Sequence, residues 1–595
     1  YCDPIHPHAD PLIWREHSWY GAHMAYKLEE AGKTGILNAA IFSGWAHLGF
    51  HWIGNYHNIA SMLTESASAK LATPMYIHRE QLQGGEYGSL VGTELFPHYK
   101  PQTTFPHPWP GGWWRLRDIV EQQKISSWAL LDMAARNKET VLWNAYQKAE
   151  RQVERGGCCK PAAYVIPKCQ NDPLTAEKLV EKLLAQGVEV KKAAEGFGAG
   201  DTVFEAGSYV VFLDQPKMGL VKTLLGRTYY PDDAWTRKQD RTPYRPYDSA
   251  TDTMAEFMGV RVDPIECLPA GSFENVVEYR SPAGRTSGES RIGFALDGRL
   301  NDSFRAVNAL LNGGVKVQRI EEELESDGVT YPPGSFIAVG PRSAIEKAAK
   351  DAGVEFRALK EKPKAKAHEV RRLRAAMYQR YWGGNIDEGW TRWVLEQFGF
   401  PYTTIMDADI KKGGLNESFD VILLPNDNPA IIVGGEELEK WWKENRPGFP
   451  LPIVPPEYRS GIGQEGVDSL KKFVEGGGIL VTLGEACDFA TEKLGLGVRN
   501  VVKGLNPKDF YCPGSPLHTE FDICHPLAYG MPDEGLVLFW SGMAFDISPS
   551  EFNERYEPVA RYPEREVLQS GWLIGEEKIA GKIAMLSAKL GKGRV

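Results

Sequence analysis

An internal repeat constrains the fold of this chain more than any other feature. The matching segments are 179–190 with 306–317, 207–212 with 334–339, and 163–167 with 293–297, the last pair after a shift of three residues. Gly187 and Gly314, like Gly207 and Gly334, are 127 residues apart. A constant offset across a helix and two strands indicates duplication of a strand, helix, strand, strand unit.

An aromatic loop and a short helix join the two copies. This connection, residues 228–262, contains a helix expected near 251–258. Its aromatic residues are Tyr229, Tyr230, Trp235, Tyr244 and Tyr247. We find no arrangement of catalytic residues in the module, so the sequence favours a structural or ligand-gripping role for it.

The whole chain is too long for one hydrophobic core. Its 595 residues predict two to four domains. We place them at 1–155, at 156–360 (the duplicated α+β module, with copies near 162–214 and 292–340) and at 370–595. A charged, proline-containing linker at 360–366 precedes the last domain. The predicted fold class is therefore α/β and multidomain.

Charge and hydropathy argue against a nucleic-acid partner and against a membrane-spanning helix. The net charge of −10 argues against a nucleic-acid surface. No apolar run approaches the roughly 18 residues that a membrane helix needs, so we expect no membrane span. Eight cysteines without C-x-x-C spacing indicate no cysteine zinc site and leave the compartment open.

The last 220 or so residues alternate between apolar strands and helices, as in a parallel α/β sheet. The strands are expected at 375–380, 419–425 and 478–483, and the helices at 387–398 and 467–475. Cys487 follows the third strand at the place of a nucleophile elbow, and His525 is a candidate base. The domain resembles class I glutamine amidotransferases, but it lacks G-x-C-x-G, and Leu527 stands where those enzymes carry Glu. A non-catalytic amidotransferase-like domain is the better interpretation.

In the first domain, we expect helices at 11–31 and 116–147, a strand at 35–42 and an aromatic loop at 43–56. The apolar run 59–63 predicts a further strand that ends at Glu65. Small residues follow and leave room beside this carboxylate. Thr64 and Ser66 allow a plainer reading, in which Glu65 belongs to a helix cap.

Ten of the thirteen histidines lie in the first 107 residues. This bias raises the hypothesis of a metal site, and the pairs His6/His8 and His47/His51 have suitable residue types. No H-x-x-E or H-E-x-x-H motif accompanies them. Because a metal needs three or four converging ligands, ordinary surface or hydrogen-bonding roles are favoured for these histidines.

Several segments give the chain a family resemblance. They are PIHPHADPL from Pro4, EAGKTG from Glu30, YHN from Tyr56, LTE from Leu63, PWPGGWW from Pro108, SWALL from Ser127, and DEGWTRW from Asp387. In these segments the chain resembles the zinc carboxypeptidases of the carboxypeptidase A type, in a bacterial subgroup with a C-terminal amidotransferase-like domain. The first domain would then be the C-terminal portion of a carboxypeptidase-like domain.

The resemblance implies a function and roles for two residues. Glu65 matches the family's general base, and Tyr56 is a candidate phenol on the substrate side. The zinc ligands and the arginines that grip the substrate carboxylate are expected upstream of Tyr1, so zinc would have no ligands in this chain. The resemblance also implies an extracytoplasmic location, either periplasmic or secreted.

Three functions compete on this reading. The first is a zinc metallocarboxypeptidase, or its C-terminal portion, that acts on a peptide substrate with Glu65 as general base. The second is a catalytically inactive, peptidase-like binding or assembly protein. Thiol hydrolysis at Cys487 is the third. The first requires a longer polypeptide, an oligomer or a partner to supply the missing N-terminal segment.

Overall fold

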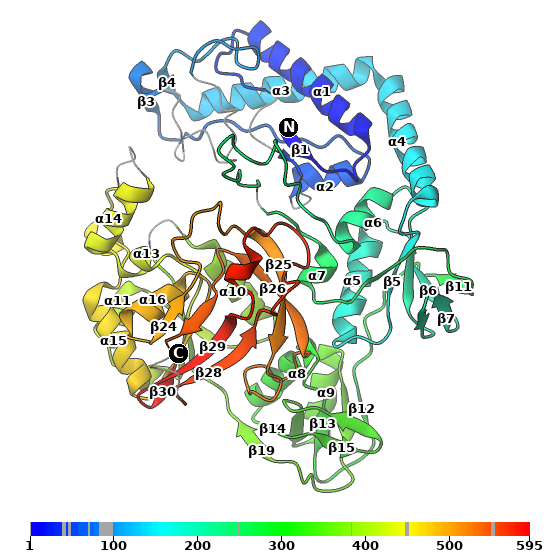
Figure 1. Ribbon diagram of the computed structural model, residues 1–595, viewed down its shortest axis with the longest axis vertical. Coiled ribbons are helices and arrows are strands. Elements are labelled where there is room, and N and C mark those ends of the chain that lie inside the picture. The colour runs from blue at the N-terminus through cyan, green and yellow to red at the C-terminus, as the bar shows by residue number, and fades with distance from the viewer. Residues whose placement is uncertain are drawn as a thin grey trace.

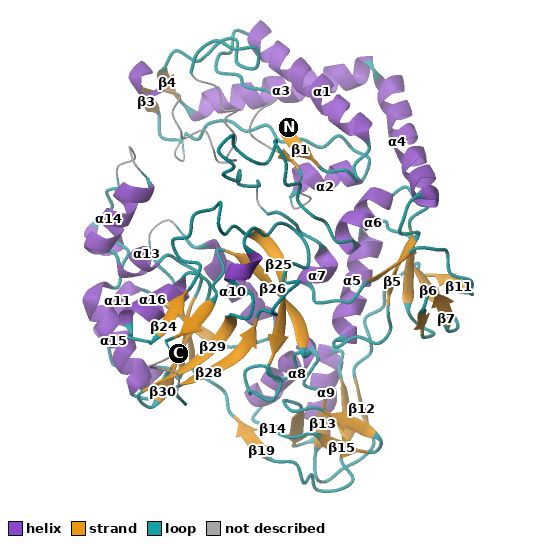
Figure 2. Cartoon of the chain, viewed as in Figure 1, coloured by secondary structure: helices purple, strands orange, loops and turns teal. Residues whose placement is uncertain are grey.

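Three groups of elements follow one another along the chain in the computed structural model (Figure 1). The structure describes residues 2–38, 43–45, 49–69, 72–82, 99–247, 249–381, 384–446, 451–548 and 554–595. Helices and strands occur in all three groups, and the strands form several separate sheets (Figure 2). The predicted mixed α/β, multidomain class is confirmed at this level. Within the described ranges, no helix is both long and apolar enough to cross a membrane.

Long helices dominate the first group. Its elements are β1 (Cys2–Ile5), α1 (Pro11–Glu30), β2 (Ser43–Gly44), α2 (Phe50–Tyr56), β3 (Met75–Ile77), the 3-10 helix η1 (Arg79–Leu82), β4 (Gly112–Trp114), α3 (Leu116–Arg136) and α4 (Lys138–Cys158). Asp10 caps α1 by accepting the Leu12 N–H at 2.9 Å, and Pro11 occupies the first turn. The helix expected at 11–31 is confirmed, and α1 packs against α3.

The predicted strand at 59–63 is wrong. Residues 59–69 form neither strand nor helix, so the helix-cap reading of Glu65 is wrong as well. A strand needs a neighbour to satisfy its N–H and C=O groups, but Ile59 N–H instead bonds back to Gly54 O at 3.0 Å. Ser61 Oγ donates to Phe50 O at 2.9 Å and holds the segment against α2.

Three other expectations in this group need correction. The expected aromatic loop contains α2 over its last seven residues. Of the strand expected at 35–42, residues 35–38 have no regular structure, and 39–42 lie outside the described residues. The single helix expected at 116–147 is two helices, because Asn137 leaves the helical conformation, with φ of −114° and ψ of 25°. Its backbone N–H and its Nδ2 both donate to Met133 O, at 3.0 and 2.9 Å.

The middle group consists of two βαββαβ units, the arrangement of ferredoxin-like domains. The first contains β5 (Ala163–Ile166), α5 (Pro173–Ala185), β6 (Lys191–Ala193), β7 (Phe197–Ala199), β8 (Thr202–Phe204), β9 (Tyr209–Phe212), α6 (Met218–Leu225), α7 (Met254–Phe257), β10 (Asp263–Ile265) and β11 (Phe273–Asn275). The second contains β12 (Arg285–Ser287), β13 (Phe294–Leu296), α8 (Asn301–Asn312), β14 (Lys316–Ile320), β15 (Leu324–Ser326), β16 (Val329–Tyr331), β17 (Phe336–Val339), α9 (Arg342–Ala352), β18 (Glu355–Ala358) and β19 (Ala367–Val370).

The two units share strand order and pairing direction. The first sheet has the order β10-β5-β9-β6-β11, and the second contains β18-β13-β17-β14-β19, antiparallel at every step in both. Buried Ser208 Oγ accepts the Lys168 N–H at 3.1 Å, and buried Ser335 Oγ accepts the Gly298 N–H at 3.1 Å. Segments matched in the sequence therefore occupy equivalent places in space. Strand β19 extends the second sheet beyond residue 360.

The third group is built on one large mixed sheet. Its elements are β20 (Ala375–Tyr378), α10 (Ile386–Gln397), β21 (Tyr402–Ile405), α11 (Asp407–Lys412), α12 (Leu415–Ser418), β22 (Val421–Leu424), α13 (Pro429–Val433), α14 (Gly435–Asn445), η3 (Pro456–Tyr458), α15 (Gly463–Glu475), β23 (Ile479–Thr482), α16 (Ala486–Lys493), β24 (Val498–Asn500), β25 (Pro513–Phe521), β26 (Glu534–Trp540), β27 (Phe545–Ile547), β28 (Tyr556–Arg561), η5 (Glu576–Lys578), β29 (Ile583–Leu590) and β30 (Gly593–Arg594).

Part of this sheet is parallel and part is antiparallel. Strands β21-β20-β22-β23-β30 are parallel neighbours, and β29, β28, β25 and β26 continue the sheet in antiparallel fashion. In chain order the parallel part is 2-1-3-4-5, as in flavodoxin-type sheets. Such sheets bind ligands beyond the carboxyl ends of the strands, where the strand order reverses. Here that point lies between β20 and β22.

Candidate functional site

Glu65 lies on the surface, in the irregular segment that follows α2. Its side chain is exposed and has no hydrogen bond or ion pair with another described residue. Both flanking residues are held by Gln123 of α3: Thr64 Oγ1 donates to Gln123 Oε1 at 3.1 Å, and Gln123 Nε2 donates to Ser66 Oγ at 2.9 Å. The backbone around Glu65 is therefore fixed, while its carboxylate is available.

Tyr56, the candidate substrate phenol, is buried at the end of α2. Only 2% of it is exposed, and its hydroxyl donates to Trp45 O at 3.2 Å. Burial raises the pKa of Tyr56 well above its usual value. Its role in substrate binding stays a prediction, which requires the hydroxyl to leave the Trp45 carbonyl.

Two histidines of the first group, His8 and His17, lie among packed elements and have hydrogen-bonding neighbours. His8 Nδ1 lies 3.3 Å from Thr223 Oγ1 of α6, and burial lowers the pKa of His8 to about 3. His17 Nε2 lies 3.1 Å from Asn55 Oδ1, and burial lowers the pKa of His17 to about 4. His47 lies outside the described residues. Among the residues that the structure describes, no three His, Cys, Asp or Glu side chains are grouped to hold a metal ion.

Cys487 does not have the surroundings of a nucleophile. Its thiol donates to Thr482 O at 3.3 Å, and burial raises the pKa of Cys487 to about 11. His525 Nε2 instead lies 3.4 Å from Glu557 Oε2. A thiol that stays protonated at neutral pH is a poor nucleophile, so the structure argues against hydrolysis at Cys487.

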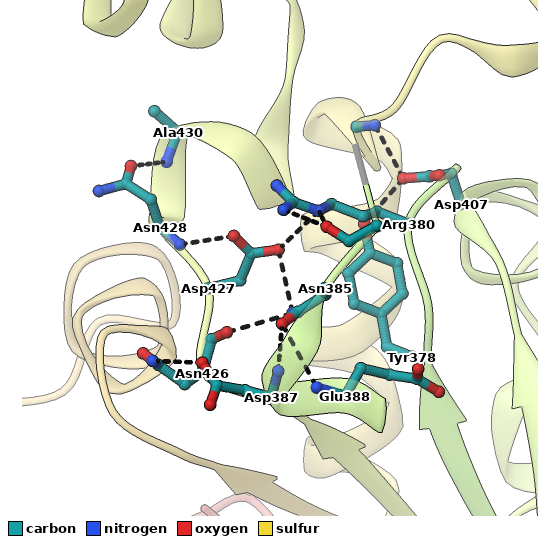
Figure 3. Close-up of polar contacts among 12 residues, drawn as sticks. Tyr378, Arg380, Asn385, Asp387, Glu388, Asp407, Asn426, Asp427, Asn428 and Ala430 are labelled. Atoms are coloured by element: carbon teal, nitrogen blue, oxygen red, sulfur yellow. Dashed lines mark hydrogen bonds and ion pairs between the residues drawn. The ribbon is translucent and has the colours of Figure 1, made fainter. Parts of the chain in front are cut away.

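A polar cluster occupies the carboxyl end of the parallel strands (Figure 3). The loop after β20 contributes Arg380 and Asn385, the loop after β22 contributes residues 426–428, and the turn after β23 contributes Glu485. Asp387 joins the cluster from the first turn of α10. These loops meet where the strand order reverses, which is the usual ligand site of such sheets.

Asp427 lies at the centre of the cluster, and its side chain is 8% exposed. One of its carboxylate oxygens lies 3.2 Å from Arg380 Nε and 3.4 Å from Asn385 Nδ2, and the other accepts the Asn428 N–H at 2.9 Å. Arg380 Nε and Nη2 also donate to Gly384 O. Its Nη1 is buried and has no hydrogen-bond partner among the described residues.

Two asparagines connect the remaining carboxylates. Asn426 Nδ2 donates to Asp387 Oδ2 at 2.8 Å, and Asn426 Oδ1 accepts the Glu485 N–H at 2.8 Å. Asn428 Nδ2 donates to Glu485 Oε2 at 3.0 Å. A Cβ on Gly484 would lie 2.4 Å from Asn426 Oδ1, so this close approach requires glycine. The cluster is therefore one connected network across three loops.

The surroundings of Asp427 bring its pKa close to neutral pH. Burial raises the pKa of Asp427 to about 6, and the charges of Glu485 and Asp387 add to the rise, while Arg380 opposes it. A carboxyl group with this pKa can gain or lose a proton under ordinary conditions. Chemically, the cluster can hold a small polar ligand or exchange a proton with it.

The sequence interpretation missed this cluster, although a signal was present. Asn426, Asp427 and Asn428 directly follow the strand expected at 419–425, and Glu485 follows the strand expected at 478–483. Because the carboxyl ends of parallel strands share one edge, polar residues at these places come together. The strand expected at 375–380 includes Arg380, but β20 ends at Tyr378 and leaves Arg380 in the loop.

Comparisons with known proteins give one structural neighbour to report and no family. No protein family matches the chain, and no curated protein does. Among solved structures, a ThuA-like protein from Bacteroides uniformis aligns with 38% of this chain and 82% of its own, at 14% identity and a TM-score of 0.21. So weak a likeness supports no assignment of fold or function.

Proposed function

We propose that the chain is the C-terminal portion of a zinc-dependent metallocarboxypeptidase, with Glu65 as general base. The observation that carries the proposal is an exposed carboxylate without a partner among the described residues, on a backbone that Gln123 fixes on both sides. The sequence segments around Tyr56 and Glu65 supply the family context. A peptide substrate and an extracytoplasmic location belong to the same proposal.

The chemistry asked of Glu65 is proton transfer. The carboxylate takes a proton from the attacking water, whose oxygen bonds to the carbonyl carbon of the C-terminal peptide bond. As the C–N bond breaks, Glu65 gives that proton to the leaving amine. The products are a shortened peptide with a new carboxylate and a free amino acid. Catalysis of this kind contributes about 10²- to 10⁴-fold.

The described residues of this chain do not form a zinc site. A zinc site in such enzymes needs His₂Glu or a similar set, and the described ranges contain no such group. The proposal therefore places the metal ligands in sequence upstream of Tyr1. Only Glu65 and its surroundings are assigned to this chain.

The test uses the polypeptide as its gene encodes it, including any residues that precede Tyr1. We expect one zinc ion per polypeptide and stepwise loss of C-terminal residues from a peptide mixture, followed by mass spectrometry. Removal of the metal with a chelator should abolish the hydrolysis, and added zinc should restore it. A polypeptide that retains no zinc and leaves every peptide intact would contradict the proposal.

The polar cluster favours a second candidate, a binding role without catalysis in an amidotransferase-like domain. Its specific observation is the unpartnered, buried Nη1 of Arg380 beside Asp427. A thermal-shift screen of amino acids, sugars and nucleotides tests it. A true ligand should bind at least tenfold more weakly to Asp427→Asn and unchanged to Asp468→Asn, an exposed aspartate of α15. Equal binding to both variants would rule the cluster out.

A further inference from the structure

A hollow of about 350 Å³ lies between the N-terminal strand and the loop that follows α6. Figure 1 shows this loop, in green, beside the N-terminal end of the chain. The hollow is lined by Asp3, Pro4, Ile5, Pro7, Trp45, Tyr229, Pro231, Asp233 and Trp235. Its size falls within the usual range for small-molecule sites, about 300 to 1,000 Å³. Neither Glu65 nor the polar cluster contributes to it.

Two aromatic residues of the hollow, Trp45 and Tyr229, are held by hydrogen bonds to other parts of the chain. Trp45 is 6% exposed, and its Nε1 donates to Ala250 O at 2.9 Å. Tyr229 forms a backbone bridge with Gly571 of the C-terminal group. Tyr229 and Trp235 are 56% and 67% exposed. Large aromatic side chains this exposed, beside a hollow, are available to a ligand.

The loop that carries Asp233 is also fixed. Asp233 Oδ1 accepts the Trp235 N–H at 2.8 Å, and the Asp233 N–H donates to Thr236 Oγ1 at 2.9 Å. Asp233 and Trp235, both in this turn, line the same hollow. An acidic group and an aromatic face are thereby presented together.

Among the described residues that line the hollow, two are acidic and none carries a positive charge. The neighbouring Asp232 is neutralised by Arg237, with Nη2 to Oδ2 at 2.7 Å, and also lies 3.3 Å from Trp572 Nε1. Asp3 and Asp233 form no ion pair with a described residue. The polar side-chain groups of the lining are these two carboxylates, the phenol of Tyr229 and the indole N–H groups of Trp45 and Trp235. A matching ligand must therefore bring donors and positive charge.

We infer that this hollow binds an organic cation, a guanidinium or ammonium group on a short apolar stem. The aromatic rings attract the cation, and Asp3 and Asp233 supply the counter-charge. A neutral sugar fits less well, because its hydroxyl groups could donate to Asp3 and Asp233 but would bring no positive charge to offset these two carboxylates. The cation comes either as a free small molecule or as a basic residue of a peptide.

Isothermal titration of the intact chain tests this inference. The probes are agmatine, the peptide acetyl-Gly-Arg-Gly-amide, its neutral citrulline counterpart and maltotriose. We expect saturable binding of agmatine, the arginine peptide or both, at least tenfold tighter than the citrulline peptide. The stronger of the two cationic probes identifies the source of the ligand.

Matched variants locate the binding. Asp233→Asn and Trp235→Ala should each weaken it at least tenfold. Asp351→Asn in α9 and Trp390→Ala, which is 62% exposed on α10, should leave it unchanged. Thermal unfolding of all four variants checks that they fold. Equal binding of the citrulline peptide, binding of maltotriose alone, no binding of any probe, or unchanged binding in both pocket variants would overturn the inference.

Discussion

Gly207 and Gly334 occupy equivalent places in the two βαββαβ units and have nearly the same left-handed backbone, with φ of 91° and 92°. Their surroundings differ. A Cβ on Gly207 would touch flexible lysine side chains, Lys168 at 3.4 Å and Lys192 at 3.8 Å, whereas a Cβ on Gly334 would lie 2.4 Å from Tyr529 Cβ. Both positions therefore require a left-handed backbone, but only at Gly334 would an added Cβ clash with a neighbouring residue.

We therefore expect Gly334→Ala to destabilise the protein more than Gly207→Ala. The strained φ costs both variants about 1–2 kcal/mol, and the clash with Tyr529 adds to the cost in Gly334→Ala alone. The midpoints of thermal unfolding measure the difference. Equal losses in the two variants would mean that Tyr529 moves away freely.

Asp427 gives a prediction for pH. Its pKa of about 6 in the folded protein lies above the value of about 3.9 for an unfolded aspartate. Between these values the folded state binds more protons, so stability falls as pH rises. The stabilisation that comes from protonated Asp427 is fully present below about pH 4 and is lost as the pH rises through about 6. Its upper limit is about 3 kcal/mol.

Asp427→Asn removes this titration. The free energy of unfolding of the wild type, relative to the variant, should fall between pH 4 and pH 6. Infrared difference spectra of wild type against variant should show a protonated carboxyl that disappears near pH 6. A carboxyl band already absent at pH 4.5 would contradict the raised pKa.

Helices α1 and α4 are joined by a buried ion pair that no sequence pattern indicated. Glu16 of α1 pairs with Lys148 of α4, with side chains 2% and 4% exposed, and Asn144 Nδ2 donates to Glu16 at 3.1 Å. Removing one partner leaves a buried charge without a counter-charge, which typically costs about 3–5 kcal/mol.

Lys148→Met should therefore lower the unfolding midpoint markedly, while Lys138→Met at the exposed start of α4 should change it little. The double variant Glu16→Leu/Lys148→Met should recover most of the loss, because the stranded charge is gone. Amide hydrogen exchange in α1 and α4 should be fastest in Lys148→Met, slower in the double variant and close to the wild-type rate in Lys138→Met. Failure of the double variant to recover would show that packing, rather than charge, holds these helices together.

Elements with strong local signals were predicted well. Helix α1, with its Asp10 cap and Pro11, and the buried strand β22 were both placed within a few residues. The segment 59–69 was not, because an apolar run becomes a strand only beside a partner. Asn137 ends α3 with a non-helical backbone and a side-chain bond to Met133 O, neither of which hydrophobic periodicity predicts.

At the scale of the whole molecule, the 127-residue offset in the sequence predicts which segments occupy equivalent places in the two similar sheets. The alternation of strands and helices likewise indicated a parallel sheet in the last group. The contacts among Arg380, Asp427 and Glu485 join three distant loops, so they depend on strand order as well as on residue type. The aromatic hollow likewise joins residues near the N-terminus to residues after 228.

The proposed activity depends on Glu65. Its carboxylate is exposed, and Gln123 holds the neighbouring Thr64; the role of Glu65 as general base is our proposal. Glu80 is the matched control, because it is an exposed glutamate in the same group of elements.

The most direct test is the rate of release of C-terminal amino acids by the gene-encoded polypeptide and its variants. Glu65→Gln should lower kcat by about 10²- to 10⁴-fold with the bound zinc unchanged, and Glu80→Gln should match the wild type. A Glu65→Gln polypeptide that holds zinc and turns over at the wild-type rate would contradict the central claim.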